Sequence, residues 1–428
     1  MVLHTVTAGQ TLASIAREYG VAPGLVARVN GLTEPYRLAV GQSLLILFPA
    51  QLHTVREGET LWTIAARYGT SPLQLLRNNP NLEGRAALYP GQVLAVAWAD
   101  PPGRSVDVNG YAYPFVNEAV LRGILPYATY LTPFTYGVSA EGGLVEPEDR
   151  RLIELAAAYG AAALMHLSTL TEGGGFSNER AAYVLSSPAR QETLAALAAR
   201  QAAARGYQGV DVDFEFIDPA QAALYAQFLG VLRGMLHAQG MELITALAPK
   251  VSADQPGILY EGHDYRLIGE NSDAVLLMTY EWGYTYGPPM AVAPIQAVRQ
   301  VLDYAVTEIP PEKILMGFPN YAYNWTLPFT AGESRAASLS NPGAVELAIA
   351  VGAEIHFDET AQTPYFYYTD DAGAVHEVWF EDARSSLAKF RLVEEYGFRG
   401  IGYWNFMRAF PVNFSLLNAL FQIRSGTA

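Results

Sequence analysis

The chain has 428 residues, of which 50% are hydrophobic and 16% charged, so it carries enough apolar material for a large core in two or three domains. Its formal net charge of −15 argues against a nucleic acid or an anionic membrane as partner, since both would call for basic patches. The absence of cysteine excludes disulfides and thiol catalysis.

The amino-terminal segment shows no export signal. Residues 1–16 lack a charged region followed by an unbroken apolar run, so no Sec signal peptide is visible. No stretch reaches the roughly 18 continuous apolar residues that a membrane-spanning helix needs. We therefore expect a soluble protein with no membrane partner.

The first hundred residues repeat one pattern. The segment His4-Thr5-Val6 recurs as His53-Thr54-Val55, and the same offset of 49 residues relates Asn30 to Asn79. In each copy, apolar residues at i, i+3, i+4 and i+7 predict a short helix that a glycine ends. A second helix and short flanking strands complete the order strand, helix, helix, strand.

The two copies, residues 1–49 and 50–99, resemble the LysM module. The resemblance implies binding of glycans that contain N-acetylglucosamine, such as peptidoglycan and chitin, between two loops of each copy. The residues expected near the sugar are Gly9, Thr11, Leu12 and Asn30 in the first copy and Gly58, Thr60, Leu61 and Asn79 in the second. The threonines and asparagines also suit helix caps and turns, and this structural role is the alternative at each position.

Strands and helices alternate after a proline-stiffened linker at residues 100–103. Within residues 103–428, eight strands are expected at 106–113, 128–138, 161–168, 209–216, 242–248, 274–281, 313–318 and 400–406. Helical runs lie between them, so the repeated βα pattern predicts an α/β fold, a (β/α)8 TIM barrel. A doubly wound sheet is the alternative.

The segment between the seventh and eighth strands is longer than one helix needs. Aromatic runs on both sides of Asp370-Asp371-Ala372-Gly373 predict a hairpin within it. We assign residues 325 to about 381 to a small α+β insertion in the barrel.

The fourth strand carries three carboxylates, Asp211, Asp213 and Glu215, at alternate positions. In a strand all three face one way, and repulsion together with desolvation should leave a proton shared or retained among them. A metal site or a solvated edge is the structural alternative. A metal site usually recruits histidine, which is absent nearby, so we expect neither a metal nor a cofactor.

This strand resembles the DGxDxDxE motif of family 18 glycoside hydrolases, with Gln208 in place of the first Asp. Two more segments are similar to motifs of that family. The segment 278–281 resembles its sixth-strand MxYD, with Glu281 where Asp is usual, and 402–404 resembles the end of its eighth strand. The family also often carries an α+β insertion that walls one side of the cleft.

The resemblance implies a substrate-assisted mechanism, in which the substrate's own N-acetyl oxygen attacks the anomeric carbon. Glu215 would be the general acid, Asp213 would bind the acetamido N–H, and Asp211 would share the proton of Asp213. Tyr280 would hold the acetamido oxygen in line, and Trp404 would stack against the sugar.

Other residues near strand ends are weaker candidates. Tyr111, Tyr321 and Tyr323, with Glu281, are expected to contact substrate as cleft walls, although aromatic residues at such positions more often serve packing. His166 is expected to be a core histidine rather than a base. Lys250 would line the cleft or solvate its rim.

The order of modules resembles the spore-germination YaaH and SleL group of cortex-lytic N-acetylglucosaminidases. This implies retaining hydrolysis of the β-1,4 bond after N-acetylglucosamine in spore cortex peptidoglycan or its fragments. The implied partner is peptidoglycan or another glycan that contains N-acetylglucosamine, and the implied location is the spore cortex or coat, or the cell wall. A chitinase and a catalytically inert glycan-binding spore-coat protein are the alternatives.

Overall fold

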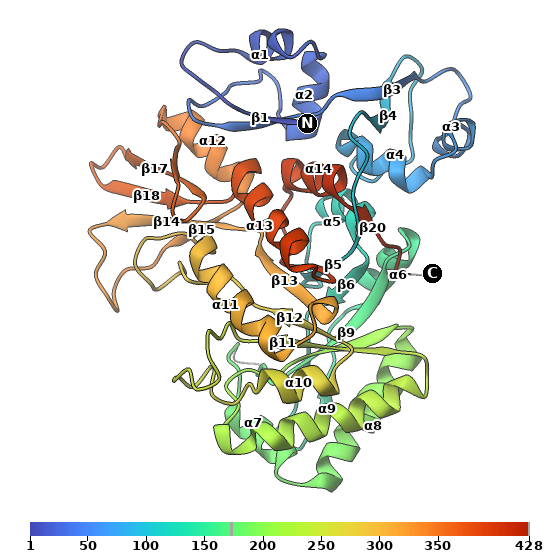
Figure 1. Ribbon diagram of the computed structural model, residues 1–428, viewed down its shortest axis with the longest axis vertical. Coiled ribbons are helices and arrows are strands. Elements are labelled where there is room, and N and C mark those ends of the chain that lie inside the picture. Colours follow the sequence, from blue (N-terminus) through green and yellow to red (C-terminus); the bar gives the residue numbers. More distant parts are fainter. Residues whose placement is uncertain (172–173, 427–428) are drawn as a thin grey trace.

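The computed structural model describes residues 1–171 and 174–426, and a closed ring of eight parallel strands lies at its centre (Figure 1). Around the ring the order is β10-β11-β12-β13-β19-β5-β6-β9, and β9 pairs with β10 to close it. The strands are β5 (Ser105–Ala112), β6 (Tyr130–Pro133), β9 (Ala162–Ser168), β10 (Gly209–Asp213), β11 (Glu242–Leu247), β12 (Ala274–Leu277), β13 (Ile314–Pro319) and β19 (Gly400–Trp404). The closure confirms the TIM barrel and excludes the doubly wound sheet.

Helices surround the ring and bury their apolar faces against it. They are α5 (Glu118–Ile124), α6 (Arg150–Ala158), α7 (Asn178–Leu185), α8 (Pro188–Arg205), α9 (Ala222–His237), α10 (Tyr265–Asn271), α11 (Ile295–Glu308), α13 (Ala383–Tyr396) and α14 (Pro411–Leu420). Leu194 on α8 and Leu229 on α9 are fully buried in the core that the helices share with the strands. Among the described residues, no helix is both long and apolar enough to cross a membrane.

Three expected strands differ most from the observed ones, one by a break in its middle and two by an earlier carboxyl end. The expected strand 128–138 is divided into β6 and β7 (Tyr136–Val138), and β7 also pairs with β8 (Leu144–Val145). The fourth strand ends at Asp213 and the sixth at Leu277, several residues before the expected ends. In all three places the strand pairing stops where side chains of the segment begin to contact the site described below.

The two amino-terminal repeats fold as expected. The first consists of β1 (Val2–Thr5), α1 (Leu12–Glu18), α2 (Pro23–Asn30) and β2 (Ser43–Ile46), and the second of β3 (Pro49–Thr54), α3 (Leu61–Tyr68), α4 (Pro72–Asn78) and β4 (Val93–Trp98). In each repeat the two strands pair antiparallel, and a small apolar core lies between them and the helices.

Both repeats are packed against the barrel (Figure 1). Helices α2 and α4 lie against α14. At Gly41 the approach is so close that an added Cβ would lie 1.8 Å from the carbonyl oxygen of Ile355. The linker itself is fixed, because Gly103 N donates to Leu420 O at 2.7 Å. The linker expected at 100–103 therefore does not act as a free spacer.

The second repeat is anchored by a buried arginine. Arg77 is 8% exposed, and its Nε donates to the carbonyl of Pro126 at 2.5 Å. Its Nη1 donates to Ile423 O at 3.3 Å, and Tyr127 donates its hydroxyl to Arg77 O at 2.8 Å. Burial lowers the pKa of Arg77 to about 10. These contacts hold the second repeat against the barrel. Undocking the repeat would leave the buried Arg77 guanidinium and its carbonyl partners without hydrogen bonds, which costs free energy.

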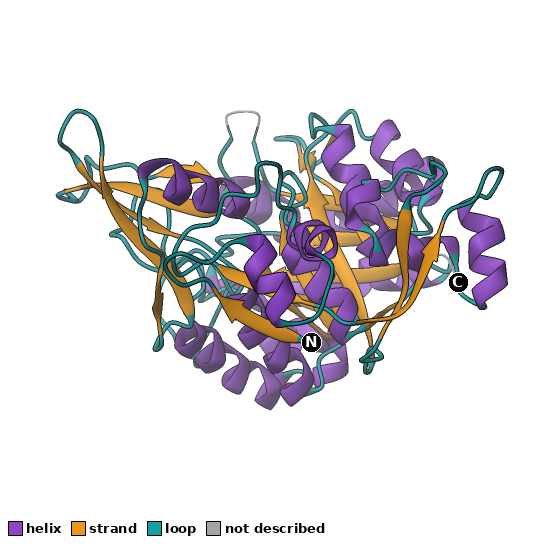
Figure 2. Cartoon of the chain, turned by 90° about the horizontal axis from the view of Figure 1, so that it is seen from above, coloured by secondary structure: helices purple, strands orange, loops and turns teal. Residues whose placement is uncertain are grey.

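The insertion is a five-stranded antiparallel sheet that extends away from the barrel, on the left in Figure 2. Its strands, in the order β15-β14-β18-β17-β16, are β14 (Ala322–Leu327), β15 (Ala337–Leu339), β16 (His356–Asp358), β17 (Thr363–Thr369) and β18 (Val375–Trp379), and α12 (Asn341–Val351) precedes β16. The hairpin expected around residues 370–373 is confirmed as β17–β18.

The insertion begins at β14, three residues before the expected boundary, and supports the cleft from behind. Trp325 Nε1 donates to Gly287 O at 2.8 Å, and Ala336 N donates to Thr285 O at 2.8 Å. None of the strands of the insertion contributes to the lining of the cleft described below. It therefore holds the loop 281–294 in place, and the expectation that it walls the cleft directly is corrected.

Candidate active site

A cavity of about 530 Å³ opens at the carboxyl ends of the barrel strands. Functional residues of TIM barrels come from this end because the βα loops start there. The cavity is lined by Tyr111, Tyr113, Phe134, Leu170, Gly174, Phe176, Asp213, Glu215, Ala246, Pro249, Leu259, Tyr260, Leu276, Met278, Tyr280, Glu281, Trp282 and Trp404. Residues expected from three separate motifs thus share one cavity.

The three carboxylates on and just after β10 lie at different depths relative to the cavity. Asp211 is fully buried below the cavity, Asp213 is 6% exposed at its floor, and Glu215 follows the end of the strand and lines the wall. Phe214 points the other way, where its ring stacks on Tyr225 with 5.7 Å between centroids. The alternation predicted from the sequence therefore continues two residues beyond the regular strand, through Phe214 and Glu215.

Asp211 is held by a tyrosine of the first strand. Tyr111 donates its hydroxyl to Asp211 Oδ2 at 2.7 Å. Burial raises the pKa of Asp211 to about 6, against the opposing effects of His166 and of this hydrogen bond. Tyr111 also lines the cavity, so it reaches both the substrate side and the buried acid.

Glu215 has the electrostatics of a general acid. Burial and then the negative charge of Asp213 raise the pKa of Glu215 well above its ordinary range. A carboxyl group that stays protonated near neutral pH can donate its proton to a leaving group. Tyr280 lines the same cavity, and burial followed by the charge of Asp213 raises its pKa well above 10, so its phenol is a neutral donor there.

His166 is a core histidine, as expected from the sequence, and it contacts the site from behind the cavity lining. It is fully buried on β9, and its Nε2 lies 3.5 Å from Asp213 Oδ2. Its Nδ1 lies 2.6 Å from Thr135 Oγ1, which in turn lies 2.8 Å from Ser168 Oγ. The imidazole is thus fixed by hydroxyl groups and faces the carboxylate of Asp213.

A second buried histidine, His263, fixes the backbone between Asp213 and Glu215. Ala248 N donates to Nδ1 of His263 at 3.0 Å, so Nε2 carries the proton and donates to Phe214 O, also at 3.0 Å. Burial lowers the pKa of His263, which keeps it neutral. Lys250 does not line the cavity: it is 2% exposed and its Nζ donates to His263 O and Ala253 O. Neither residue was expected in this supporting role.

Trp404 stands among aromatic rings at the end of β19. Its centroid lies 5.4 Å from that of Tyr111, 5.2 Å from that of Phe134 and 6.2 Å from that of Tyr113. Phe134 also stacks on His166 with 4.6 Å between centroids. These rings give the cavity a rigid apolar surface, which is the kind of surface against which a sugar face packs.

Glu281 is held by the two tyrosines that follow β13. Tyr321 donates a short hydrogen bond to Glu281 Oε1, and Tyr323 donates to the same oxygen at 3.3 Å. Burial raises the pKa of Glu281, and both hydrogen bonds oppose the rise. Glu281 lines the cavity, whereas Tyr321 and Tyr323 lie behind it. They therefore position Glu281 and are not cleft walls.

In the amino-terminal repeats, the expected sugar-binding polar residues have structural partners. Thr11 and Thr60 cap α1 and α3 through their hydroxyl groups. Asn30 Nδ2 donates to Val26 O and Leu45 O, and Asn79 does the same with the equivalent carbonyls, Leu75 O and Ala95 O. Their side chains hold the loops in shape, and contact with a glycan at Gly9, Leu12, Gly58 or Leu61 stays a prediction.

The two repeats differ in the aromatic residues that they expose to solvent. In the second repeat Trp62 is 62% exposed and Tyr89 is 72% exposed. The equivalent positions in the first repeat are Ala13 and Ala39, and Ala39 is buried against the insertion. At these two positions the second repeat therefore exposes aromatic side chains where the first has alanine, a difference that the sequence could have indicated.

Within residues 1–171 and 174–426, no group of three or more His, Cys, Asp or Glu side chains could hold a metal ion.

Comparison with known proteins identifies both kinds of domain. The family Glycosyl hydrolases family 18 matches residues 148–408, and the LysM domain matches residues 4–47 and 53–97. The cortical fragment-lytic enzyme of Bacillus subtilis (strain 168) is 40% identical over 429 residues, which cover 99% of each chain. The putative sporulation-specific glycosylase YdhD of the same organism is 32% identical and covers 99% of this chain and all of that one.

Solved structures with the same architecture include the spore cortex-lytic enzyme SleL of Bacillus megaterium QM B1551. It is 37% identical, its TM-score is 0.84, and the similarity covers 99% of this chain and 98% of that one. A chitinase from Chromobacterium violaceum is 25% identical with a TM-score of 0.68, over 74% of this chain and 99% of the chitinase.

Proposed function

The chain belongs to glycosyl hydrolases family 18 and carries two LysM domains, and we propose that it is an N-acetylglucosaminidase of spore cortex peptidoglycan. The bond cleaved is the β-1,4 bond that follows N-acetylglucosamine in cortex or in its fragments, with retention of configuration. The observation that carries the proposal is one cavity that holds Asp213, Glu215, Tyr280 and Trp404 together.

Glu215 acts as the acid and then as the base. Its raised pKa keeps a proton available for the leaving oxygen at neutral pH. Once the leaving sugar has departed, the Glu215 carboxylate takes a proton from the water that opens the oxazolinium intermediate. The nucleophile in the first step is the acetamido oxygen of the substrate, so the protein needs no second carboxylate in that role.

Asp213 and Tyr280 position the acetamido group for this attack. Asp213 accepts the acetamido N–H and offsets the positive charge that develops on the ring, while the neutral Tyr280 hydroxyl donates to the acetamido oxygen. Support comes from the cavity, which both residues line, and from His166, which faces Asp213 at 3.5 Å. Asp211, held by Tyr111, shares the proton of Asp213 from below. Trp404 stacks on the sugar, and Glu281 accepts a sugar hydroxyl.

The LysM domains bind the same class of glycan and retain the enzyme on it, at the spore cortex or coat or at the cell wall. The exposed rings of Trp62 and Tyr89 support this role for the second domain, since aromatic faces pack against sugars. With a net charge of −15, recognition rests on neutral sugar units rather than on attraction to polyanions.

Product analysis on purified cortex fragments tests the proposal. Digestion followed by borohydride reduction and mass spectrometry should convert N-acetylglucosamine residues, and not muramic acid residues, to their alditols. New muramic acid termini would contradict the bond assignment. A chitinase is the second candidate, because a chitinase shares the fold at 25% identity. Faster cleavage of chitin oligomers than of cortex fragments would favour it. Failure to cleave either glycan would favour the inert glycan-binding protein.

A further inference from the structure

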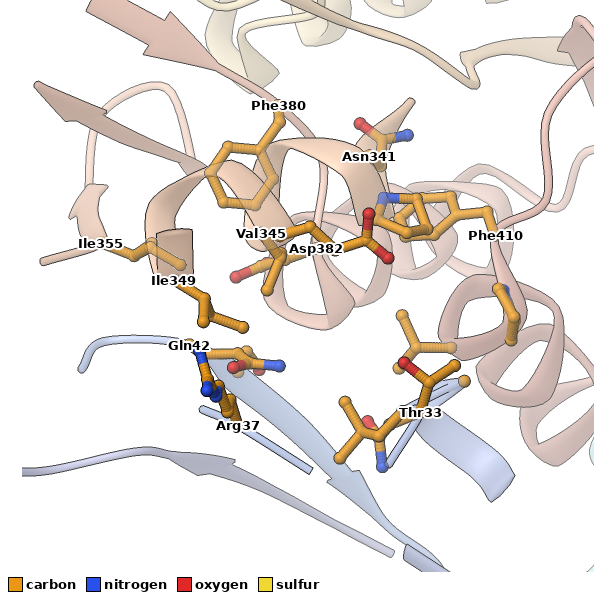
Figure 3. A pocket seen from close by; sticks show the side chains of 18 of the residues that line it. Thr33, Arg37, Gln42, Asn341, Val345, Ile349, Ile355, Phe380, Asp382 and Phe410 are labelled. Atoms are coloured by element: carbon orange, nitrogen blue, oxygen red, sulfur yellow. The ribbon is translucent and has the colours of Figure 1, made fainter. Parts of the chain in front are cut away.

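Two groups of buried polar atoms without hydrogen-bond partners stand out in the described part of the chain. One borders a cavity of about 250 Å³ between the first LysM domain and the barrel, where Ile349 faces Gln42 (Figure 3). Its unpaired atoms, such as Asn341 Nδ2, have almost no surface in that cavity, so no ligand can reach them. The other group lies inside the barrel and includes His166 Nε2 and Asp213 Oδ1. There, a partner can come from within the site itself.

The barrel strands bring His166 and Asp213 together. On the adjacent parallel strands β9 and β10, His166 pairs with Asp211, and Ser168 pairs with Asp213. Paired residues point to the same face of a sheet, so all four side chains enter the barrel interior. His166 is fully buried there, and its Nε2 lies 3.5 Å from Asp213 Oδ2, slightly beyond hydrogen-bond length. Asp213 Oδ2 therefore has a ring nitrogen as its neighbour, whereas Oδ1 has no partner within residues 1–171 and 174–426.

A chain of hydroxyl groups sets which nitrogen of His166 carries the ring proton. Leu170 N donates to Ser168 Oγ at 3.3 Å. Ser168 Oγ lies 2.8 Å from Thr135 Oγ1, which lies 2.6 Å from His166 Nδ1. Within the described residues the Ser168 proton has Thr135 as its acceptor. The Thr135 proton then goes to Nδ1, because its other acceptor, a backbone carbonyl, is more distant at 3.3 Å. Since Nδ1 accepts, Nε2 carries the ring proton and directs it toward Asp213.

A donor at Oδ2 gives Asp213 what its proposed role requires. To accept the acetamido N–H, the carboxylate must hold one oxygen toward the substrate. A hydrogen bond to Oδ2 opposes rotation of the carboxylate and leaves Oδ1 free, and hydrogen bonds to charged acceptors are the stronger class. The ring of His166 is itself held, because it stacks on Phe134 with 4.6 Å between centroids and meets Tyr111 edge-on at 5.5 Å. The donor is therefore rigid.

We propose that His166 is a positioning residue, whose Nε2–H holds Asp213 Oδ2 and so directs Oδ1 to the acetamido N–H of the substrate. The inference rests on the proposed function, because it takes Asp213 as the group that binds the acetamido N–H. The 3.5 Å contact shortens to a hydrogen bond when the substrate fixes the carboxylate, as such contacts commonly tighten in enzyme–substrate complexes. His166 itself touches no substrate, since it lies outside the cavity lining.

Two substitutions separate the donor from the ring. The amide of glutamine reaches the position of Nε2 and keeps a donor for Asp213, whereas the shorter asparagine reaches only the position of Nδ1. Both remove the ring that stacks on Phe134, so the loss of packing is common to the two. On cortex fragments, His166→Asn should lower kcat about 10–10²-fold, the effect of losing a hydrogen bond to a charged group. His166→Gln should stay within about 3-fold of the unaltered enzyme. Equal losses of kcat in the two variants would overturn the proposal.

The Asp213→Asn background tests whether His166 acts through Asp213. There, His166→Asn should lower the remaining kcat by less than about 3-fold, because the carboxylate that His166 positions is already gone. A fall of about 10–10²-fold in both backgrounds would mean that His166 supports the site through packing alone, and the positioning role would be wrong.

NMR of the full chain reads the proton on His166 without any reaction. The chain is labelled with ¹⁵N-histidine, and the His166 signals are those missing from the spectrum of His166→Gln. At neutral pH we expect a protonated Nε2, and Asp213→Asn should shift its ¹⁵N resonance more than that of His4 in the first LysM domain. An unprotonated Nε2 would refute the donor, whatever the activities show. Failure of the unaltered chain to cleave cortex fragments, with the protonated Nε2 and its shift observed, would instead count against the proposed function alone.

Discussion

Alanine substitution at two equivalent glycines measures how firmly the first LysM domain is docked. Gly41 and Gly91 occupy the same position in the two domains, with φ of 82° and 86°. Both substitutions place an L side chain in the left-handed region, at a cost of about 1–2 kcal/mol. At Gly91 an added Cβ meets nothing within 4 Å, whereas at Gly41 it meets the carbonyl oxygen of Ile355 at 1.8 Å.

Gly41→Ala must therefore separate the domain from the insertion. Two hydrogen bonds cross the interface at this point, Ile355 N to Val40 O at 2.9 Å and Arg384 Nη2 to Gly41 O at 3.1 Å. Their loss leaves buried groups unpaired, at about 1–2 kcal/mol each at the lower end of the usual range. The expected destabilisation is about 1–2 kcal/mol for Gly91→Ala and about 3–6 kcal/mol for Gly41→Ala.

Urea unfolding followed by circular dichroism, at one pH and protein concentration, compares the two variants with the unaltered chain. Equal shifts of the unfolding midpoint would refute the docked arrangement, because the backbone penalty alone would then explain both. A larger shift for Gly91→Ala would contradict it more strongly.

The remaining predictions concern the cleft. Glu215→Gln should leave the unfolding midpoint unchanged and lower turnover at least about 10²-fold, which is the low end of general acid catalysis. Near-normal turnover of this variant would contradict the assignment of Glu215 as the acid. In the unaltered enzyme, activity should persist through neutral pH and fall as the pH rises through the raised pKa of Glu215, since the acid must be protonated to act. Asp213→Asn should slow turnover and shift this loss of activity at alkaline pH to lower pH, because the charge of Asp213 contributes to the raised pKa of Glu215. If the pH at which activity is lost does not change, a group other than Glu215 produces the loss. Tyr321→Phe removes the shorter hydrogen bond to Glu281 and should raise KM about 3–10-fold with less change in kcat. Tyr323→Phe removes the longer hydrogen bond and should raise KM by a smaller factor. A larger rise in KM for Tyr323→Phe would contradict the positioning of Glu281 by Tyr321.

The sequence predicts those features that repeat or alternate. The offset of 49 residues exposes the two LysM domains, and eight apolar strands separated by helical runs predict the barrel. Because all strands of a barrel end on one face, the order of strands along the chain is enough to place Glu215, Tyr280 and Trp404 together.

Residues that act through a single long-range contact leave no such pattern. His166 and His263 are isolated in the sequence, and their importance lies in atoms contributed by β6–β7, β10 and β11. The docking of the LysM domains likewise depends on one arginine, Arg77, and on close backbone approach at Gly41. Asn30 and Asn79 repeat at the expected spacing, but repetition alone does not separate a sugar ligand from the two backbone bonds that each side chain makes.

The anomeric configuration of the first product tests the substrate-assisted mechanism most directly. Cortex fragments are mixed with the full-length enzyme inside an NMR spectrometer, and the anomeric proton of the new N-acetylglucosamine terminus is followed before mutarotation equilibrates it. Attack by the acetamido oxygen and then by water inverts the centre twice, so the β-anomer should form first. A first product in the α configuration would mean a single inversion and would contradict the roles given to Asp213, Glu215 and Tyr280.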